Sequence, residues 1–297
     1  TASDLSKLSL SIFNAADSVQ SKELHRLIHF LKHKEKPDLI ILSLVLFSEL
    51  AKKIKAHINV PLVCFLQDED TFIDTFAKPY INQSWDAIGR GVKHIDAFFT
   101  GSHYFKSHMA KQLSVPIDNI TVVNQGIDLT QYVPHNAPLK IPTIGYLSQV
   151  THAKGLDTLL EAFFKLKKID ALSHIQLRIA GNKIYTDKQY VKMIKDKINQ
   201  SMYKDDIHFD DAFDLRIRKH FFEQVSILSV PEVNEVSYGL YVLEALASGI
   251  PVVQPKNGVF PEMLDTTGGG VLVAPNNVNA LVDGLKTLLL NPNDAHA

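Results

Sequence analysis

The chain has 297 residues, 45% of them hydrophobic, which is enough for about two globular domains with ordinary cores. Its 31 lysine and arginine residues nearly balance its 32 aspartate and glutamate residues, so no overall charge attracts nucleic acid or anionic membrane. The longest apolar runs, such as "LIILSLVLF" at 39–47, are much shorter than the roughly 20 residues of a membrane-spanning helix. We expect small-molecule partners, no nucleic acid, and at most peripheral contact with a membrane.

The cellular location is predicted from cysteine usage and from the first residues. Cys64 is the single cysteine, lies in the apolar run "VPLVCFL", and can form no disulfide within the chain. The first residues carry no basic segment followed by a long apolar core, so no signal peptide is recognised. The sequence therefore predicts a cytoplasmic location.

In the first half of the chain, strand-like and helix-like segments alternate. In "SKELHRLIHFLKHKEKP", apolar residues from Leu24 to Leu31 recur at the spacing of one helix face, and Pro37 ends the helix. Strands are then predicted at 38–43, 60–66, 96–100 and 119–123, and helices at 46–57, 80–94 and 102–113. No convincing element precedes residue 20. Since a doubly wound sheet commonly has five or six strands, this half is predicted to be incomplete.

A proline-rich segment, "YVPHNAPLKIP", separates this half from the next and places a domain boundary between residues 133 and 134. Strands follow at 142–148, 175–180, 206–209, 225–230, 251–254 and 270–273, and helices at 155–168, 187–200, 214–224, 239–248, 258–264 and 277–290. Strands that are apolar on both faces and separated by helices indicate a parallel sheet covered on both sides. The sequence therefore predicts an α/β protein with two Rossmann-like doubly wound domains, 1–133 and 134–297, the first incomplete.

Ligands of open α/β sheets bind beyond the carboxyl ends of the strands, so the loops that lead into helices hold the candidate site residues. In the loop before the predicted helix at 155–168, Lys154 and Gly155 favour an anion. Backbone N–H groups and the helix dipole attract negative charge there, and a lysine adds a point charge. The alternative is a lysine that is merely solvated.

The loop "PEVNEVSYGLYVLE" at 231–244 raises the question of a buried charge. Glu244 is the only charged side chain between Leu240 and Ala247, in a segment otherwise fit for burial. A buried carboxylate needs a partner, and an ion pair and a ligand are equally open from the sequence. Because Gly239 allows close approach of a phosphate at the helix start, Glu244 is well placed to accept hydrogen bonds from ribose hydroxyls.

Other motifs narrow the possible chemistry. Gly258 and Glu262, in the stretch "KNGVFPEML" at 256–264 that follows the predicted strand at 251–254, indicate either a turn or a ligand contact. No GxGxxG follows a strand and no GxxxxGK[ST] occurs, which argues against nicotinamide cofactors and P-loop chemistry. Three histidines recur on the first predicted helix, namely His25, His29 and His33, and a solvated face explains them better than a metal site. The run "TGGGV" at 267–271 predicts a turn before a strand.

These residues resemble a known family. The run "GLYVLEALASGIPVV" with the following "NGVFPEML" resembles the donor-site signature of the retaining family-4 glycosyltransferases. Members of that family have two Rossmann-like domains that face each other across a cleft, the GT-B fold. Two further segments resemble the same family, namely "GYLSQVTHAKGLDTLLEAF" at 145–163 and "VVNQGIDLTQY" at 122–132. The resemblance is specific over 119–290, looser over 37–118, and absent before that.

The resemblance implies transfer of a hexosyl group, with retention, from a UDP-, GDP- or ADP-sugar to a carbohydrate or lipid-linked acceptor. Carried over by position, Glu244 holds the ribose and the backbone N–H groups of Gly239 and Leu240 bind the diphosphate, whose charge Lys154 neutralises. Gly258 and Glu262 also belong to the donor site. No metal or other cofactor is required.

Three positions depart from the family pattern. Gln149 stands where the family has an arginine. The first of two glutamates with seven residues between them is Val236 here, and Glu235 has eight residues between it and Glu244. Gln67, in "CFLQDED", stands where the family often has a histidine. The residues with predicted catalytic roles are therefore Glu235, Lys154 and Gln67. A truncated or divergent transferase is expected, and the alternatives are a catalytically silent binding module or a nucleotide-sugar epimerase of the same architecture.

Overall fold

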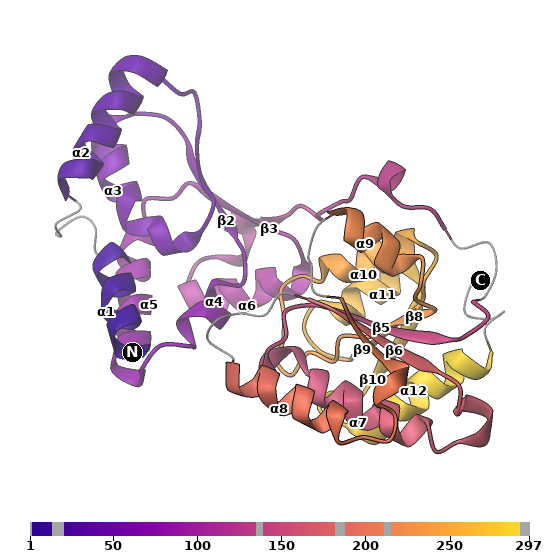
Figure 1. The fold of residues 1–297 in the computed structure, drawn as a ribbon. Coiled ribbons are helices and arrows are strands. Elements are labelled where there is room, and N and C mark those ends of the chain that lie inside the picture. The colour runs from indigo at the N-terminus through magenta and orange to yellow at the C-terminus, as the bar shows by residue number, and fades with distance from the viewer. Residues whose placement is uncertain (1, 14–20, 135–138, 182–187, 211–214, 292–297) are drawn as a thin grey trace. The chain divides into compact units, whose positions relative to one another are not determined.

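A computed structural model describes residues 2–13, 21–134, 139–181, 188–210 and 215–291 (Figure 1). The chain separates into two compact units, Thr1–Gln125 and Gly126–Ala297. This division falls shortly before the predicted boundary at 133/134, and residues 135–138 of the proline-rich segment lie outside the described part of the chain. The residues just after Gln125 belong to the second unit. Among them, Tyr132 donates a hydrogen bond of 3.0 Å to Glu244 of the same unit.

The first unit is built on a parallel sheet of four strands in the order β1-β2-β3-β4. The strands are β1 (Ile40–Leu42), β2 (Leu62–Leu66), β3 (Ala97–Thr100) and β4 (Ile120–Val122). Each lies within a segment that the sequence predicts as a strand. In the centre of the sheet, Cys64 of β2 pairs with Leu42 of β1 and Phe98 of β3. All three side chains are buried, as expected for a parallel sheet between helices.

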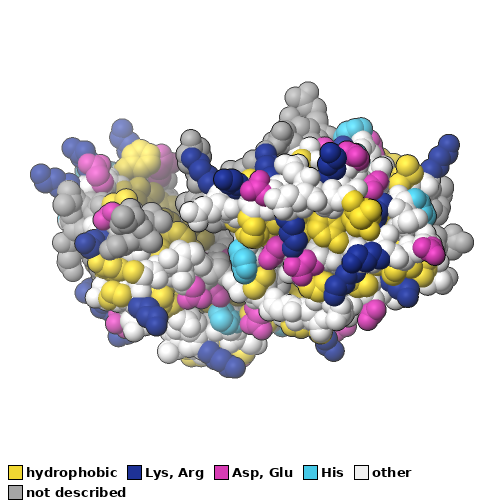
Figure 2. Space-filling model, turned by 60° about the horizontal axis from the view of Figure 1, so that its bottom comes forward, with side chains coloured by type: hydrophobic (Ala, Val, Ile, Leu, Met, Phe, Trp, Pro, Cys, Tyr) yellow, Lys and Arg dark blue, Asp and Glu magenta, His cyan; other side chains and the backbone are white. Residues whose placement is uncertain are grey.

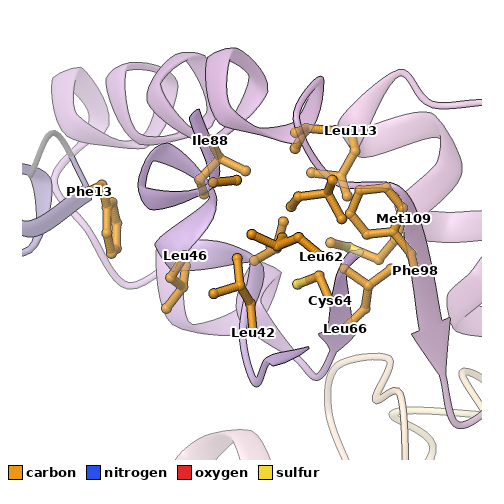
Figure 3. Close-up of a cluster of buried hydrophobic side chains, with 14 of the residues drawn as sticks. Phe13, Leu42, Leu46, Leu62, Cys64, Leu66, Ile88, Phe98, Met109 and Leu113 are labelled. Carbon is orange, nitrogen blue, oxygen red and sulfur yellow. The ribbon is translucent and has the colours of Figure 1, made fainter. Parts of the chain in front are cut away.

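Six α-helices lie in the described part of the first unit: α1 (Ala2–Phe13), α2 (Ser21–Phe30), α3 (Ser48–His57), α4 (Glu69–Ile73), α5 (Lys78–Val92) and α6 (His103–Leu113). With the sheet they enclose one core that includes Leu62, Phe98 and Met109 (Figure 3). No element is expected from the sequence before residue 20, yet α1 is present there. Its Phe13 is buried and stacks on Phe76 with 6.3 Å between ring centroids, so tertiary packing stabilises this helix.

The second unit contains a parallel sheet of six strands in the order β10-β9-β8-β5-β6-β7. The strands are β5 (Thr143–Leu147), β6 (Gln176–Ala180), β7 (Ile207–Asp210), β8 (Ile227–Leu228), β9 (Val252–Pro255) and β10 (Gly270–Val273). The chain moves outward from β5 to β7 and then returns to the other side of β5, so the order reverses between β5 and β8. This is the 3-2-1-4-5-6 order of a doubly wound sheet.

Helices cover both faces of this second sheet. The helices are α7 (Leu156–Leu166), α8 (Lys188–Asn199), α9 (Leu215–Phe222), α10 (Leu240–Ala247), α11 (Phe260–Thr267) and α12 (Val278–Leu290). On one face, α7, α8 and α12 enclose one core, and on the other, α9, α10 and α11 enclose a second (Figure 1). The starts predicted for α8 and α9, residues 187 and 214, lie outside the described residues. The predicted turn at 267–271 is confirmed, since Gly268 ends α11 with a φ of 78°.

The charge distribution on the surface and the lengths of the helices agree with the nearly balanced charge and the short apolar runs of the sequence. Acidic and basic side chains are interspersed over the face shown in Figure 2, as the formal net charge of −1 leads one to expect. In the part of the chain that the structure describes, no helix combines the length and the apolar character needed to cross a bilayer.

Candidate functional site

Three loops meet at the carboxyl edge of the second sheet, beside the point where the strand order reverses. They follow β5, β8 and β9, and backbone hydrogen bonds join them. The N–H of Val233 donates to Ala153 O over 2.9 Å, and the N–H of Val259 donates to Val236 O over 3.1 Å. Crevices of this kind hold the ligands of doubly wound sheets.

Two glycines allow these loops to approach each other. Gly155 has a φ of 65°, and a Cβ added there would lie 2.0 Å from Pro231 O. Gly258 has a φ of 54°, and a Cβ added there would lie 2.7 Å from the backbone N and O of Val236. Any other residue at either position would be strained in φ and would overlap backbone atoms. The turn expected at Gly258 is therefore present, and its predicted contact with a ligand stays a prediction.

Lys154 is held by a buried carboxylate. Its Nζ lies 2.8 Å from Glu232 Oε1, and the lysine side chain is 26% exposed while that of Glu232 is 2% exposed. The hydroxyl of Tyr241, on α10, donates to the same oxygen over 3.0 Å. An ammonium group has three donors, so this contact leaves Lys154 with hydrogens for another anion.

Glu244 takes part in a second buried ion pair. Its Oε1 lies 2.8 Å from Arg218 Nη1 of α9 and also accepts the Tyr132 hydroxyl over 3.0 Å. Burial and the adjacent carboxylate raise the pKa of Tyr132 to about 12, so its hydroxyl keeps its proton at neutral pH. The other oxygen, Oε2, is buried and has no hydrogen-bond partner among the described residues. The ion pair that the sequence leaves open is present, and it satisfies only one of the two carboxylate oxygens.

Helix α10 takes part in both groups of contacts, through Tyr241 beside Glu232 and through Glu244. Tyr241 and Glu244 are three residues apart on this helix and therefore share a face. Gly239 is the residue before the helix and, having no side chain, makes no capping hydrogen bond to it. The backbone N–H groups of Gly239 and Leu240 consequently stay available at the positive end of the helix dipole.

The other residues predicted for the donor site lie on the same three loops or on α11. Gln149 is exposed, and its backbone carbonyl accepts a hydrogen bond from the Tyr146 hydroxyl over 2.8 Å. Glu235 is exposed, whereas Val236 is 5% exposed and packs in the core beneath α10 and α11. Glu262 lies in the first turn of α11.

Gln67 belongs to the first unit, in the loop after β2. Its side-chain amide donates to Ser43 O over 2.8 Å, and its backbone N–H donates to Glu69 Oε2 over 2.6 Å. Glu69 is 1% exposed and also accepts the N–H of Val45 over 3.0 Å. Burial raises the pKa of Glu69 to about 7, against the lowering effect of these two N–H donors. Glu69 thus joins the loops that follow β1 and β2.

Four residues of this site in the second unit are absent from the sequence-based prediction: Tyr132, Arg218, Glu232 and Tyr241. In the first unit, Glu69 beside Gln67 is absent from it as well. Arg218 is 26 positions from Glu244, and Glu232 is 78 positions from Lys154, so no local spacing reveals either pair. Glu232 and Glu69 carry one usable signal, because each is an acidic residue that closely follows a buried strand.

No metal centre is found among the described residues, in which no group of three histidine, cysteine or acidic side chains could hold an ion. Of the three histidines that recur in the first predicted helix, His25 is exposed, and its Nδ1 forms a hydrogen bond of 2.7 Å with Ser21 O. His29 and His33 are also exposed, and their rings lie 4.5 Å apart.

The second unit has the fold of a Rossmann-like domain, and the Lys154–Glu232 ion pair lies in the loops after β5 and β8, where the strand order reverses. Residues 130–297 match the family model described as "Glycosyl transferases group 1", and the chain belongs to this family. The match covers more than half of the chain and includes all the candidate residues except Gln67.

Solved structures of other proteins share the fold of this chain. The chain is similar to the Anabaena protein HepE in complex with UDP, with a TM-score of 0.76, 15% identity, and 92% and 74% of the two chains covered. It is also similar to sucrose-phosphate synthase from Thermosynechococcus elongatus, with a TM-score of 0.77, 17% identity, and 93% and 70% covered. These likenesses establish the GT-B type of fold for the two Rossmann-like units.

Among curated proteins, the D-inositol 3-phosphate glycosyltransferase of Corynebacterium glutamicum is 27% identical over 187 residues, which are 58% of this chain and 44% of that protein. The sucrose-phosphate synthase of Zea mays is 27% identical over 167 residues, 51% of this chain and 15% of that protein. The chain thus spans less than half the length of these curated relatives.

Proposed function

We propose that the protein is a glycosyltransferase that binds a nucleotide-diphosphate sugar at the carboxyl edge of the second sheet. The observation that carries this proposal concerns Oε2 of Glu244, on α10. This oxygen is buried and has no hydrogen-bond partner among the residues that the structure describes. A buried carboxylate oxygen without a donor is costly, and a ribose hydroxyl would satisfy it. The structure of HepE with UDP, a protein of similar fold, supports a nucleotide as the ligand.

The diphosphate is assigned to the adjacent turn. The N–H groups of Gly239 and Leu240 and the dipole of α10 favour its negative charge. Lys154 adds an ammonium whose position Glu232 fixes through the 2.8 Å contact. Gln149 offers an exposed amide in place of the arginine of the family, and Gly258 and Glu262 complete the proposed donor site. Because these groups stabilise charge on the leaving diphosphate, transfer is proposed to need no metal cofactor.

The finer chemistry is proposed from the resemblance to the family-4 enzymes. It includes a hexosyl group, retention at the anomeric carbon, and a carbohydrate or lipid-linked acceptor. Glu235, exposed in the loop after β8, and Gln67, in the first unit, are the candidates for contacts with the sugar and the acceptor. The cleft between the units that would bring Gln67 to the donor stays a prediction, as does the cytoplasmic location.

The test is to incubate the protein with UDP-, GDP- and ADP-hexoses in the presence of EDTA. NMR then measures the release of the nucleoside diphosphate and the anomeric configuration of the sugar product. We expect release from one donor, insensitivity to EDTA, and a retained configuration. Binding of a nucleoside diphosphate without any release would favour the silent binding module. An epimerised sugar would favour the epimerase, and an inverted product would contradict retention.

A further inference from the structure

Two hydrogen-bond donors converge on one oxygen of Glu244. Arg218 Nη1 and the Tyr132 hydroxyl lie 2.8 and 3.0 Å from Oε1, and neither contacts Oε2. Arg218 comes from α9 and Glu244 from α10, two helices on the same face of the sheet. The arginine side chain is 21% exposed and that of Glu244 is 3% exposed, so the guanidinium is the countercharge of a buried carboxylate.

This one-sided arrangement has a chemical consequence. A carboxylate has about four acceptor sites, so protein donors on both oxygens leave fewer of them for a ligand, and a buried carboxylate without a countercharge takes up a proton. Arg218 avoids both conditions, because it supplies the positive charge and occupies only Oε1. The charge-assisted contact also restricts rotation of the carboxylate.

We propose that Arg218 is a positioning residue of the donor site, which holds Glu244 by Oε1 so that Oε2 remains the acceptor for the ribose hydroxyls. This assignment rests on the proposed function, since it requires a nucleotide at Glu244. Arg218 itself needs no contact with the ligand in this role. Tyr132 supports the same oxygen without charge, which makes it the matched control.

The test is calorimetric titration of UDP, GDP and ADP at several pH values into the unmutated chain and into Arg218→Met, Arg218→Lys and Tyr132→Phe. Arg218→Met should weaken binding roughly 10-fold or more at neutral pH, the range of one charge-assisted hydrogen bond. The loss should grow as the pH falls, because Glu244 is then protonated more readily, and shrink as the pH rises. Arg218→Lys should restore most of the affinity, and Tyr132→Phe should cost only a few-fold with no new pH dependence.

The charged and titratable groups around Glu244 are Tyr132 and Asp128 in the segment before the second sheet, Tyr238 in the loop after β8, and Arg218 on α9. Burial raises the pKa of Tyr238, with Glu244 adding to the effect, and burial is likewise the main cause of the raised pKa of Tyr132. The carboxyl of Asp128 has a lowered pKa because it accepts hydrogen bonds from Thr130 and Gln131. Tyr132, Tyr238 and Asp128 therefore do not titrate between pH 6 and 8.

A double-mutant cycle with Glu244→Gln separates positioning from folding. Once the carboxylate is an amide, Arg218→Met should cost little further affinity, so Arg218→Met/Glu244→Gln should bind like Glu244→Gln alone. This double variant carries no unpaired buried charge and therefore tests the proposal even if Arg218→Met does not fold. Additive losses, or unchanged affinity in Arg218→Met, would overturn the role of Arg218. Absence of binding by the unmutated chain would instead contradict the proposed function.

Discussion

Lys154→Met should lower the free energy of unfolding of the second unit by about 3 kcal/mol, the lower end of the range for breaking a buried pair. The substitution leaves Glu232, whose side chain is 2% exposed, without its ammonium partner. The lower end applies because the lysine side chain is 26% exposed and water can approach the site. Urea unfolding, monitored on the whole chain, measures this loss. The same variant should bind nucleoside diphosphates roughly 10- to 150-fold more weakly, because one charge-assisted contact is removed.

The double variant Lys154→Met/Glu232→Gln separates the two effects. It removes both charges of the pair, so the stability should return close to that of the unmutated chain. Its affinity for nucleoside diphosphates should remain low, since no ammonium faces the phosphates. Recovery of affinity together with stability would mean that Lys154 acts only as the partner of Glu232.

The stability of the first unit should fall as the pH rises from about 4.5 to about 7, and then become constant with respect to Glu69. In that interval Glu69 keeps its proton in the folded chain, where its pKa is about 7, and has released it in the unfolded chain. The folded state thus binds more protons, and raising the pH favours unfolding. The full effect is on the order of 3 kcal/mol, at about 1.36 kcal/mol for each unit of pKa.

Glu69→Gln is the matched variant, because the amide resembles the protonated carboxyl and cannot ionise. It should be roughly 1 to 3 kcal/mol less stable than the unmutated chain at pH 5, because its NH2 group cannot accept one of the two backbone N–H bonds that the carboxyl oxygens accept. It should also lose this part of the decline toward pH 8. Urea unfolding at four pH values between 5 and 8 provides the comparison. Parallel stability curves for the two chains would show that burial of Glu69 has no such cost.

The strands of both units could be predicted because parallel strands between helices are apolar on both faces. All six strands of the second sheet lie at or near the predicted segments, and so do the four of the first. The helix α1 could not be predicted, because its stability comes from the packing of Phe13 on Phe76. These two residues are 63 positions apart in the sequence. Hydrophobic periodicity carries no information about such distant contacts.

The edge of the sheet that holds the candidate site could be predicted from the sequence, because loops at the carboxyl ends of parallel strands meet at one edge. The partners of the charged side chains in this site could not be predicted. Glu244 is a buried acid in an apolar segment, which predicts some partner, but the choice of Arg218 and Tyr132 depends on how α9 and the segment before β5 fold against α10. Tyr132 is 112 positions away from Glu244 in the sequence.

The most direct test of a donor site in the second unit is calorimetry of the unmutated chain with matched nucleosides and nucleoside diphosphates. The pairs are uridine and UDP, guanosine and GDP, and adenosine and ADP. We expect one diphosphate to bind at least about 10-fold more tightly than its nucleoside, because in the proposed site Lys154 and the start of α10 bind the phosphates that the nucleoside lacks. Equal affinity within every pair would contradict the account.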